Sequence, residues 1–146
     1  MTLVIDAAPL VALGDEDDPV RPLVRQVLQQ ESGDLVIPAP VTAEVDYLLG
    51  RRVGHRARKA FLADLAALRF RVVCLEHAEY ETVRRLDEKY DDLNFGLSDL
   101  SVVVIAHRFH TNRVLTFDER GFRVMTPLDG DHFVVLPRDE YDDRPR

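Results

Sequence analysis

The chain has 146 residues, of which 46% are hydrophobic and 31% are charged, a length and composition typical of one soluble globular domain. The formal net charge of −7 argues against broad, nonspecific binding of nucleic acid, because the long-range field repels a polyanion. The single cysteine, Cys74, excludes an intrachain disulfide, and we find neither a signal peptide nor an apolar run that could span a bilayer, so we expect a cytoplasmic protein.

The first half of the chain alternates short apolar runs with amphipathic segments. The runs TLVI, LVIP and FRVVCL predict buried strands at residues 2–5, 35–38 and 70–75. The segments around them predict helices at residues 20–30, 40–52 and 56–68, the first of which follows an acidic loop, GDEDDP. In the third helix we expect Phe61, Leu62, Leu65 and Leu68 to share one apolar side.

The second half begins with a more polar helix at residues 77–90, which the segment DDLNFG interrupts. Two further strands are predicted at residues 113–117 (RVLTF) and 133–137 (FVVLP). The charged tail from residue 138 to residue 146 is expected to be frayed. Cys74 falls within the third strand, where we expect it to fill a buried apolar position.

Residues 98–110 can be interpreted in two ways. The run VVVI has the β-branched composition of a strand. The length of the segment, the presence of Ser98 as a cap and the need for a connection before the strand at 113–117 favour a helix instead. A helix that is apolar nearly all round has to be buried on most sides.

The order of these elements predicts the fold class. Strands that alternate with helices indicate a parallel sheet covered on both faces, because right-handed crossovers place helices above and below the sheet. We therefore predict an α/β fold, a three-layer α/β/α sandwich around a five-stranded parallel sheet. One domain is expected to span residues 1–137.

Four acidic residues take equivalent places in this predicted architecture. Asp6 and Asp118 directly follow strands, Glu44 lies in the early turns of a helix, and Asp99 begins another helix. The carboxyl ends of parallel strands and the N-termini of the helices share one edge of the sheet, where ligands of such folds bind. We therefore expect the four carboxylates to lie close together. Asp46, two residues after Glu44, points to a different face of its helix.

Carboxylates that crowd together favour a metal site, because they repel one another and a hard divalent cation removes that conflict. Mg²⁺ and Mn²⁺ prefer oxygen ligands, and either ion can polarise a phosphodiester and activate a water. A simpler interpretation stays open: Asp often only caps a helix or forms a turn, and the chain has 26 acidic residues.

The segments that carry these acids are VIDAAPLVAL, IPAPVTAEVDYLL, GLSDLSVVVIAHR and VLTFDERGF. In this order they resemble the four motif blocks of PIN-domain proteins, and more narrowly the VapC ribonuclease toxins of bacterial toxin–antitoxin pairs. The resemblance extends from residue 1 to about residue 136. It implies the strand order 3-2-1-4-5 and an endoribonuclease that depends on Mg²⁺ or Mn²⁺. It also implies a cognate antitoxin that blocks the site. The protein would be a homodimer that forms a heterotetramer or larger assembly with this antitoxin.

The same resemblance implies that the catalytic acids are Asp6, Glu44, Asp99 and Asp118. Asp6 and Asp99 would be direct metal ligands, while Glu44 and Asp118 would complete the pocket directly or through water. One departure concerns the first motif, where Ala7 and Ala8 stand in place of the usual hydroxyl or amide side chain. Because neither alanine side chain can hydrogen-bond a carboxylate, a noncatalytic module that binds an antitoxin or RNA without cleavage is the alternative function.

A basic segment, RRVGHRARK at residues 51–59, offers cations that would offset the repulsion between the acids and RNA. Arg51, Arg52 and Arg56 are the candidate substrate-binding residues, with an ordinary solvated helix face as the alternative. His107 and His110 are three residues apart, but without a third ligand in view we expect them to be surface residues.

A phosphoacceptor receiver domain is a third function class that combines an α/β fold with acids at one edge. Such a domain requires an Asp at the end of the third strand and a Lys near the fifth. This chain has CLEHAE at the first place and Arg138 at the second. The sequence therefore disfavours a receiver domain.

Overall fold

The computed structural model describes residues 1–143 and contains a five-stranded sheet in the order β3-β2-β1-β4-β5. The strands are β1 (Leu3–Ile5), β2 (Leu35–Pro38), β3 (Arg71–Val73), β4 (Arg113–Leu115) and β5 (Val134–Leu136). Every neighbouring pair is parallel, and Val4 lies opposite Val36 on one side and Val114 on the other. The predicted parallel sheet and its order are confirmed.

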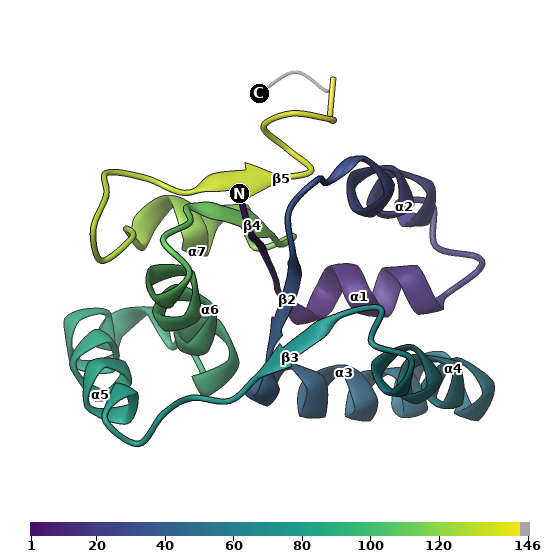
Figure 1. The fold of residues 1–146 in the computed structure, drawn as a ribbon, viewed down its shortest axis with the longest axis horizontal. Coiled ribbons are helices and arrows are strands. Elements are labelled where there is room, and N and C mark those ends of the chain that lie inside the picture. Colours follow the sequence, from purple (N-terminus) through teal and green to yellow (C-terminus); the bar gives the residue numbers. More distant parts are fainter. Residues whose placement is uncertain (144–146) are drawn as a thin grey trace.

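Helices cover both sides of this sheet (Figure 1). They are α1 (Ala7–Gly14), α2 (Arg21–Gln30), α3 (Ala39–Arg52), α4 (His55–Ala66), α5 (Glu79–Lys89), the 3₁₀ turn η1 (Asp91–Leu93), α6 (Leu97–Arg108) and α7 (Glu119–Val124). In Figure 1, α1, α2 and α4 lie to the right of the sheet and α5, α6 and α7 to the left, while α3 extends beneath α1. The fold is the predicted three-layer sandwich. Within residues 1–143, no helix is both long and apolar enough to cross a bilayer.

The core centres on β1 and α6. All three residues of β1 and the whole run from Leu100 to Ala106 in α6 are buried. The helical interpretation of VVVI is therefore confirmed, although the composition also suits a strand. Because α6 packs against the sheet, α3 and α5, apolar neighbours meet it on several sides, and this burial outweighs the β propensity of its valines.

The start of α6 differs from the prediction that Ser98 caps it. The helix begins at Leu97 with Gly96 as its N-cap, so Ser98 falls within the first turn. The Ser98 hydroxyl instead donates to the Pro40 carbonyl oxygen over 3.4 Å, which joins the starts of α6 and α3. Asp99 completes the cap, because its Oδ2 accepts a 3.1 Å hydrogen bond from the Gly96 N–H.

The helix α1 is not evident from the sequence pattern. Its segment, AAPLVALG, is apolar almost throughout and directly follows the first strand, so it shows no amphipathic period. Asp6 starts this helix by accepting a 2.8 Å hydrogen bond from the Ala7 N–H. Pro9 lies in the first turn, where the missing N–H of proline costs no helical hydrogen bond.

Two expectations about burial are wrong. Phe61 of α4 is buried, but Leu62 and Leu68 have 42% and 84% of their surface exposed, and Leu68 lies beyond the end of the helix. Cys74 follows β3 and is exposed rather than buried. Because β3 is an edge strand, its outer side lacks a neighbouring strand, and two of its three residues are exposed as well.

The tail that the sequence predicts to be frayed from residue 138 begins in contact with the domain. Asp139 accepts a 2.8 Å hydrogen bond from the Val135 N–H and pairs with Arg123. Glu140 pairs with Arg113 at the start of β4. Residues 144–146 lie outside the described part of the chain.

Ile105→Ala should lower the free energy of unfolding by about 2–5 kcal/mol, because Ile105 is fully buried in α6 and its truncation leaves a cavity. Leu68→Ala removes an exposed side chain of the same size and should change this free energy by no more than about 0.5 kcal/mol. Urea unfolding followed by circular dichroism measures both values. An equal decrease in the free energy of unfolding in both variants would contradict the central position of α6 in the core.

Candidate active site

Asp6 lies at the C-terminal end of β1 and at the start of α1. It is buried, with 6% of its surface exposed. Its Oδ1 accepts the 2.8 Å hydrogen bond from the Ala7 N–H, and its Oδ2 accepts a 2.7 Å hydrogen bond from the Thr116 hydroxyl. These two bonds fix the orientation of the carboxylate.

Thr116 connects Asp6 to Asp118. It is buried directly after β4, the strand that pairs with β1. While its Oγ1 donates to Asp6, the same oxygen accepts a 3.0 Å hydrogen bond from the Asp118 N–H. Thr116 therefore supplies, from another strand, the hydroxyl that Ala7 and Ala8 cannot offer to Asp6. The sequence analysis missed this residue, and its only local signal is a hydroxyl side chain two positions before Asp118 in VLTFD.

Asp118 caps α7 at the end of the loop that follows β4. Its Oδ1 accepts a 2.9 Å hydrogen bond from the Gly121 N–H. Gly121 leaves no room for a side chain, because a Cβ there would overlap the Asp118 carboxylate and lie 2.8 Å from the Phe95 ring. The capping bond thus orients Asp118, which remains exposed to solvent.

Asp99 and Glu44 come from the starts of α6 and α3, which contact each other. Asp99 is partly buried in the first turn of α6, where the Gly96 N–H holds its Oδ2. Glu44 lies in the second turn of α3 and is exposed. Its carboxylate makes no hydrogen bond or ion pair with any other residue that the structure describes.

The four acids are close enough for their charges to interact. The pKa of Asp6 is raised to about 6, chiefly by burial. The hydrogen bonds from Thr116 and Ala7 lower it, while the charges of Asp99 and Glu44 add to the increase. Burial also raises the pKa of Asp99, with the Gly96 N–H opposing this shift and the charges of Glu44 and Asp118 adding to it. The structure therefore brings together, from four separate segments, all of the acids that the sequence singles out.

The chemistry of this group fits a hard divalent cation. Its donors are carboxylate oxygens. Burial first and the neighbouring acids second raise the pKa values of Asp6 and Asp99, and a bound cation would favour the ionised form of both. Among residues 1–143, however, no three His, Cys, Asp or Glu side chains form a group that could hold a metal ion. An ion bound here would need water to complete its coordination, as Mg²⁺ does when one or two carboxylates bind it.

His107 and His110 are exposed, as expected, but both lie near an acid that the sequence does not suggest. Their Nδ1 atoms are 3.5 and 3.9 Å from Oδ2 of Asp129. This trio does not qualify as a metal-binding group in the described part of the chain either. The histidines are therefore separate from the four acids in both position and chemistry.

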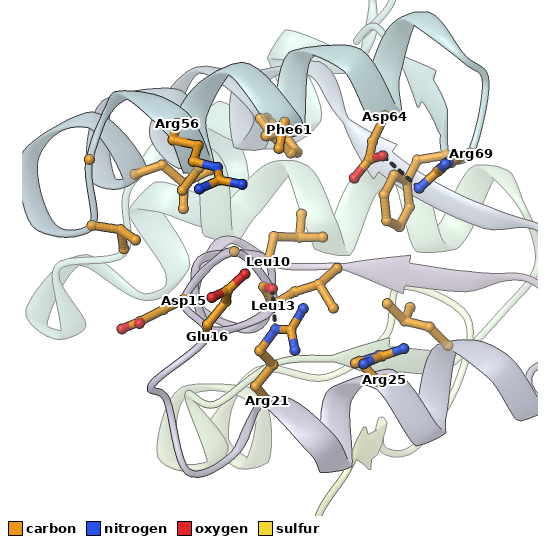
Figure 2. A pocket seen from close by; sticks show the side chains of 18 of the residues that line it. Leu10, Leu13, Asp15, Glu16, Arg21, Arg25, Arg56, Phe61, Asp64 and Arg69 are labelled. Carbon is orange, nitrogen blue, oxygen red and sulfur yellow. Dashed lines mark hydrogen bonds and ion pairs between the residues drawn. The ribbon is translucent and has the colours of Figure 1, made fainter.

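The three arginines proposed to bind substrate separate in the structure. Arg51 is exposed in the last turn of α3. Arg52 and Arg56 line a cleft at the end of α3 opposite to Glu44, and Arg56 is shown in Figure 2. Arg58, from the same basic segment, pairs with Asp46 at 2.7 Å. Closeness in sequence thus does not place these cations on one surface.

The cleft has a volume of about 960 Å³ and lies between α2 and α4, with α1 between them (Figure 2). Its apolar lining includes Leu10, Leu13 and Phe61. Figure 2 shows Arg21 and Arg25 of α2 on one side of Leu10 and Leu13, and Arg56 and Phe61 of α4 on the other. The Arg21 Nε donates a 2.9 Å hydrogen bond to the Leu13 carbonyl oxygen. The cleft therefore combines an apolar floor with charged walls, in which arginines alternate with the acids Asp15, Glu16 and Asp64.

Asp6→Asn should stabilise the metal-free protein at pH 7.5 by on the order of 3 kcal/mol. The pKa of Asp6 rises from 3.8 to about 6 on folding, so the folded protein binds this proton more tightly than the unfolded chain does. The stability that the proton contributes is complete below pH 4 and is lost as the pH rises through about 6.

Urea unfolding in EDTA, at pH 4.0 and at pH 7.5, measures this effect. The stability difference between Asp6→Asn and wild type should be larger at pH 7.5, where wild-type Asp6 carries a charge. A difference that stays constant between the two pH values would show that burial of the charge does not control the stability of this site.

Comparison with known proteins agrees with this fold. The family model of the PIN domain matches residues 3–126. Ribonuclease VapC26 of Mycobacterium tuberculosis is 35% identical over 135 residues, which cover 92% of this chain and 100% of that protein.

Two solved structures share the fold. The crystal structure of VapC20 of Mycobacterium tuberculosis, described as a sarcin-ricin loop cleaving toxin, has a TM-score of 0.74 and 20% identity, and the match covers 80% of this chain and 90% of that one. A chain of VapBC2 from Rickettsia felis, bound to a DNA fragment from their promoter, has a TM-score of 0.58 and 18% identity, with 80% and 87% covered. The chain therefore belongs to the PIN-domain family, among its VapC-type members.

Proposed function

We propose that residues 1–137 form a divalent-metal-dependent endoribonuclease, the toxin of a toxin–antitoxin pair, which acts in the cytoplasm. The observation that carries this proposal is the group formed by Asp6, Glu44, Asp99 and Asp118, whose charges interact across four segments of the chain. Two relatives support it, since VapC26 is named a ribonuclease and VapC20 is described as a toxin that cleaves the sarcin-ricin loop.

Asp6 and Asp99 are the residues that would hold a Mg²⁺ or Mn²⁺ ion directly, with Glu44 and Asp118 contributing directly or through water. When bound, the ion supplies Lewis-acid stabilisation of the phosphodiester and acidifies the attacking water. The raised pKa values of Asp6 and Asp99 support this assignment, because both carboxylates gain from a nearby positive charge.

Hydrogen bonds within the chain fix the orientation of two of these carboxylates. The Thr116 hydroxyl and the Ala7 N–H hold Asp6, and the Gly96 N–H holds Asp99. Because these groups are fixed before the substrate arrives, little reorganisation is needed as charge develops during the reaction. The exposed oxygens of Glu44 have no partner among residues 1–143 and are free to accept a proton from water. We expect cleavage to leave a 5′-phosphate and a 3′-hydroxyl.

A noncatalytic binding module remains the second candidate, and its motivation is the pair Ala7 and Ala8. The Thr116 hydroxyl gives Asp6 a side-chain hydrogen bond that neither alanine can offer. Because of this bond, the presence of Ala7 and Ala8 is a weaker reason to expect an inactive protein. Cleavage assays separate the two candidates directly.

The purified protein should cleave structured RNAs in Mg²⁺ or Mn²⁺ and should lose this activity in EDTA. Asp99→Asn should lower the rate by about 100-fold or more, because it removes a carboxylate from the reacting group. Asp129→Asn is the matched control, since Asp129 is an exposed acid beside His107 and His110, and it should leave the rate unchanged.

The ends of the RNA fragments provide the second measurement. Products with 5′-phosphate ends agree with hydrolysis by an activated water. Cleavage that persists in EDTA, or products that end in a cyclic phosphate, would instead indicate a histidine mechanism and would overturn the proposal.

We also propose that the cleft between α2 and α4 receives an apolar segment of the antitoxin that carries acidic residues. The apolar floor would bind its hydrophobic side chains, and Arg25, Arg52 and Arg56, which have no ion-pair partner among residues 1–143, would meet its carboxylates. The acids lie near the first turns of α1 and α3, whereas the cleft includes the last turns of these helices. An antitoxin anchored in the cleft would have to extend along α1 and α3 to block the acids. We expect this antitoxin to assemble with a homodimer of the chain.

Leu13→Glu should weaken binding of the cognate antitoxin by about 10-fold or more, because it places a charge on the apolar floor of the cleft. Val124→Glu is the control, since Val124 is 47% exposed on α7 and does not line the cleft. Calorimetric titration measures the affinity, and RNA cleavage by each isolated variant reports whether the active site is intact. Wild-type affinity in Leu13→Glu would exclude the cleft as the docking site.

A further inference from the structure

The outer face of α3 carries three different chemical groups in a row that starts at the four acids. Glu44, Tyr47 and Arg51 are all exposed, whereas Val41, Val45 and Leu49 of the same helix are buried. At about 100° per residue, positions 44, 47 and 51 lie within about 60° of one another around the helix axis. The row therefore presents a carboxylate, an aromatic ring and a guanidinium on one solvent-facing surface.

Tyr47 is the second member of this row. It is 64% exposed, and its ring makes no aromatic, cation–π or hydrogen-bonding contact among residues 1–143. A single exposed tyrosine needs no explanation by itself. Tyr47 differs in its position, because it follows Glu44 by three residues and so lies about 4.5 Å further along the helix.

Arg51 is the third member and is available to bind an anion. It lies about 10.5 Å along the helix from Glu44 and has no ion-pair partner in the part of the chain that the structure describes. Arg58, another cation near this end of α3, is already paired with Asp46. On a protein with a net charge of −7, an unpaired cation beside an acidic site marks a place where a polyanion can be held.

We propose that the Glu44–Tyr47–Arg51 face of α3 is a track for one RNA strand that leads away from the cleavage site. Tyr47 stacks on the base of a nucleotide flanking the scissile phosphate, and Arg51 binds a phosphate further along the strand. The inference rests on the proposed nuclease function and adds to it, because it assigns the strand a direction along α3 and names a stacking residue. Arg52 and Arg56 take no part in this track, since they line the cleft.

The chemistry of the row favours a single strand over a duplex or a second copy of this chain. A base has to be unstacked before an aromatic side chain can stack on it, which single strands allow. An interface between two copies favours aromatic and apolar residues at its centre and excludes unpaired charges. Here the ring lies between a free carboxylate and a free guanidinium.

Binding can be tested without cleavage in protein that carries Asp99→Asn. The probe is a short single-stranded oligouridine with one 2-aminopurine, whose fluorescence is quenched when an aromatic ring stacks on it. Adding Tyr47→Ala should weaken the affinity by about 5-fold or more and remove the quenching, whereas Tyr47→Phe should preserve both. Tyr80→Ala is the matched control, because Tyr80 is 48% exposed but belongs to α5, and it should change neither.

The Arg51 contribution has its own measurement, the dependence of affinity on salt concentration. Arg51→Ala should reduce the slope of log K against log salt by about 0.7, the value for one phosphate contact on a single strand. Arg51→Lys should restore most of this slope. Identical slopes for Arg51→Ala and the Asp99→Asn parent would remove Arg51 from the track.

Cleavage assays with Asp99 intact separate failure of the track from failure of the nuclease function. Tyr47→Ala should lower kcat/KM for RNA by about 5-fold or more and leave hydrolysis of bis(p-nitrophenyl) phosphate, which has no base, unchanged. If wild type cleaves RNA and Tyr47→Ala cleaves it equally well, the track is wrong and the nuclease stands. If RNA binds through Tyr47 but is not cleaved, RNA binding by this face stands, and the nuclease function is wrong.

The remaining outcome concerns assembly. If light scattering shows that Tyr47→Ala converts a dimer to a monomer, Tyr47 is a contact between subunits, and the track is overturned.

Discussion

The hydroxyl of Thr116 is the constraint on which the acidic site depends. It donates to Asp6 and accepts from the backbone of Asp118, so one buried oxygen joins the ends of β1 and β4. A buried carboxylate without hydrogen bonds would be strongly destabilising as an anion. The bonds from Thr116 and Ala7 favour the ionised form of Asp6, although burial still raises its pKa to about 6. The site therefore retains a charge that is oriented but not fully neutralised.

Much of the fold can be predicted from the sequence, because strands buried on both faces and helices with a clear apolar side leave distinct patterns. The uniformly apolar α6 can be predicted from its length and from the need for a crossover connection. In contrast, α1 cannot be recognised in the sequence, because its apolar segment follows β1 almost without interruption. Exposure at the edge of the sheet is not predictable in the same way. Cys74 is exposed because β3 has no neighbour on one side, and this depends on strand order.

The acids of the site are predictable for a geometric reason. Each lies at the end of a strand or near the start of a helix, and a parallel sheet brings these places to one edge. Thr116 is harder to recognise, since its partner Asp6 is 110 positions away and a threonine in a strand has many other roles. The arginines show the opposite problem: Arg51 and Arg52 are adjacent in sequence, but consecutive residues point to different sides of α3, so only Arg52 lines the cleft.

The parallel pairing of β1 with β4 also sets the order in which the protein can acquire its chemistry during synthesis. β1 is made first, but the hydroxyl that orients Asp6 and the acid that follows it are made more than 100 residues later. Closing so long a loop is a slow, non-local event that needs most of the chain to have left the ribosome. Until β4 and the residues after it have been made, Asp6, Glu44 and Asp99 lack Asp118, and a growing chain therefore remains without the complete set of four carboxylates for most of its synthesis.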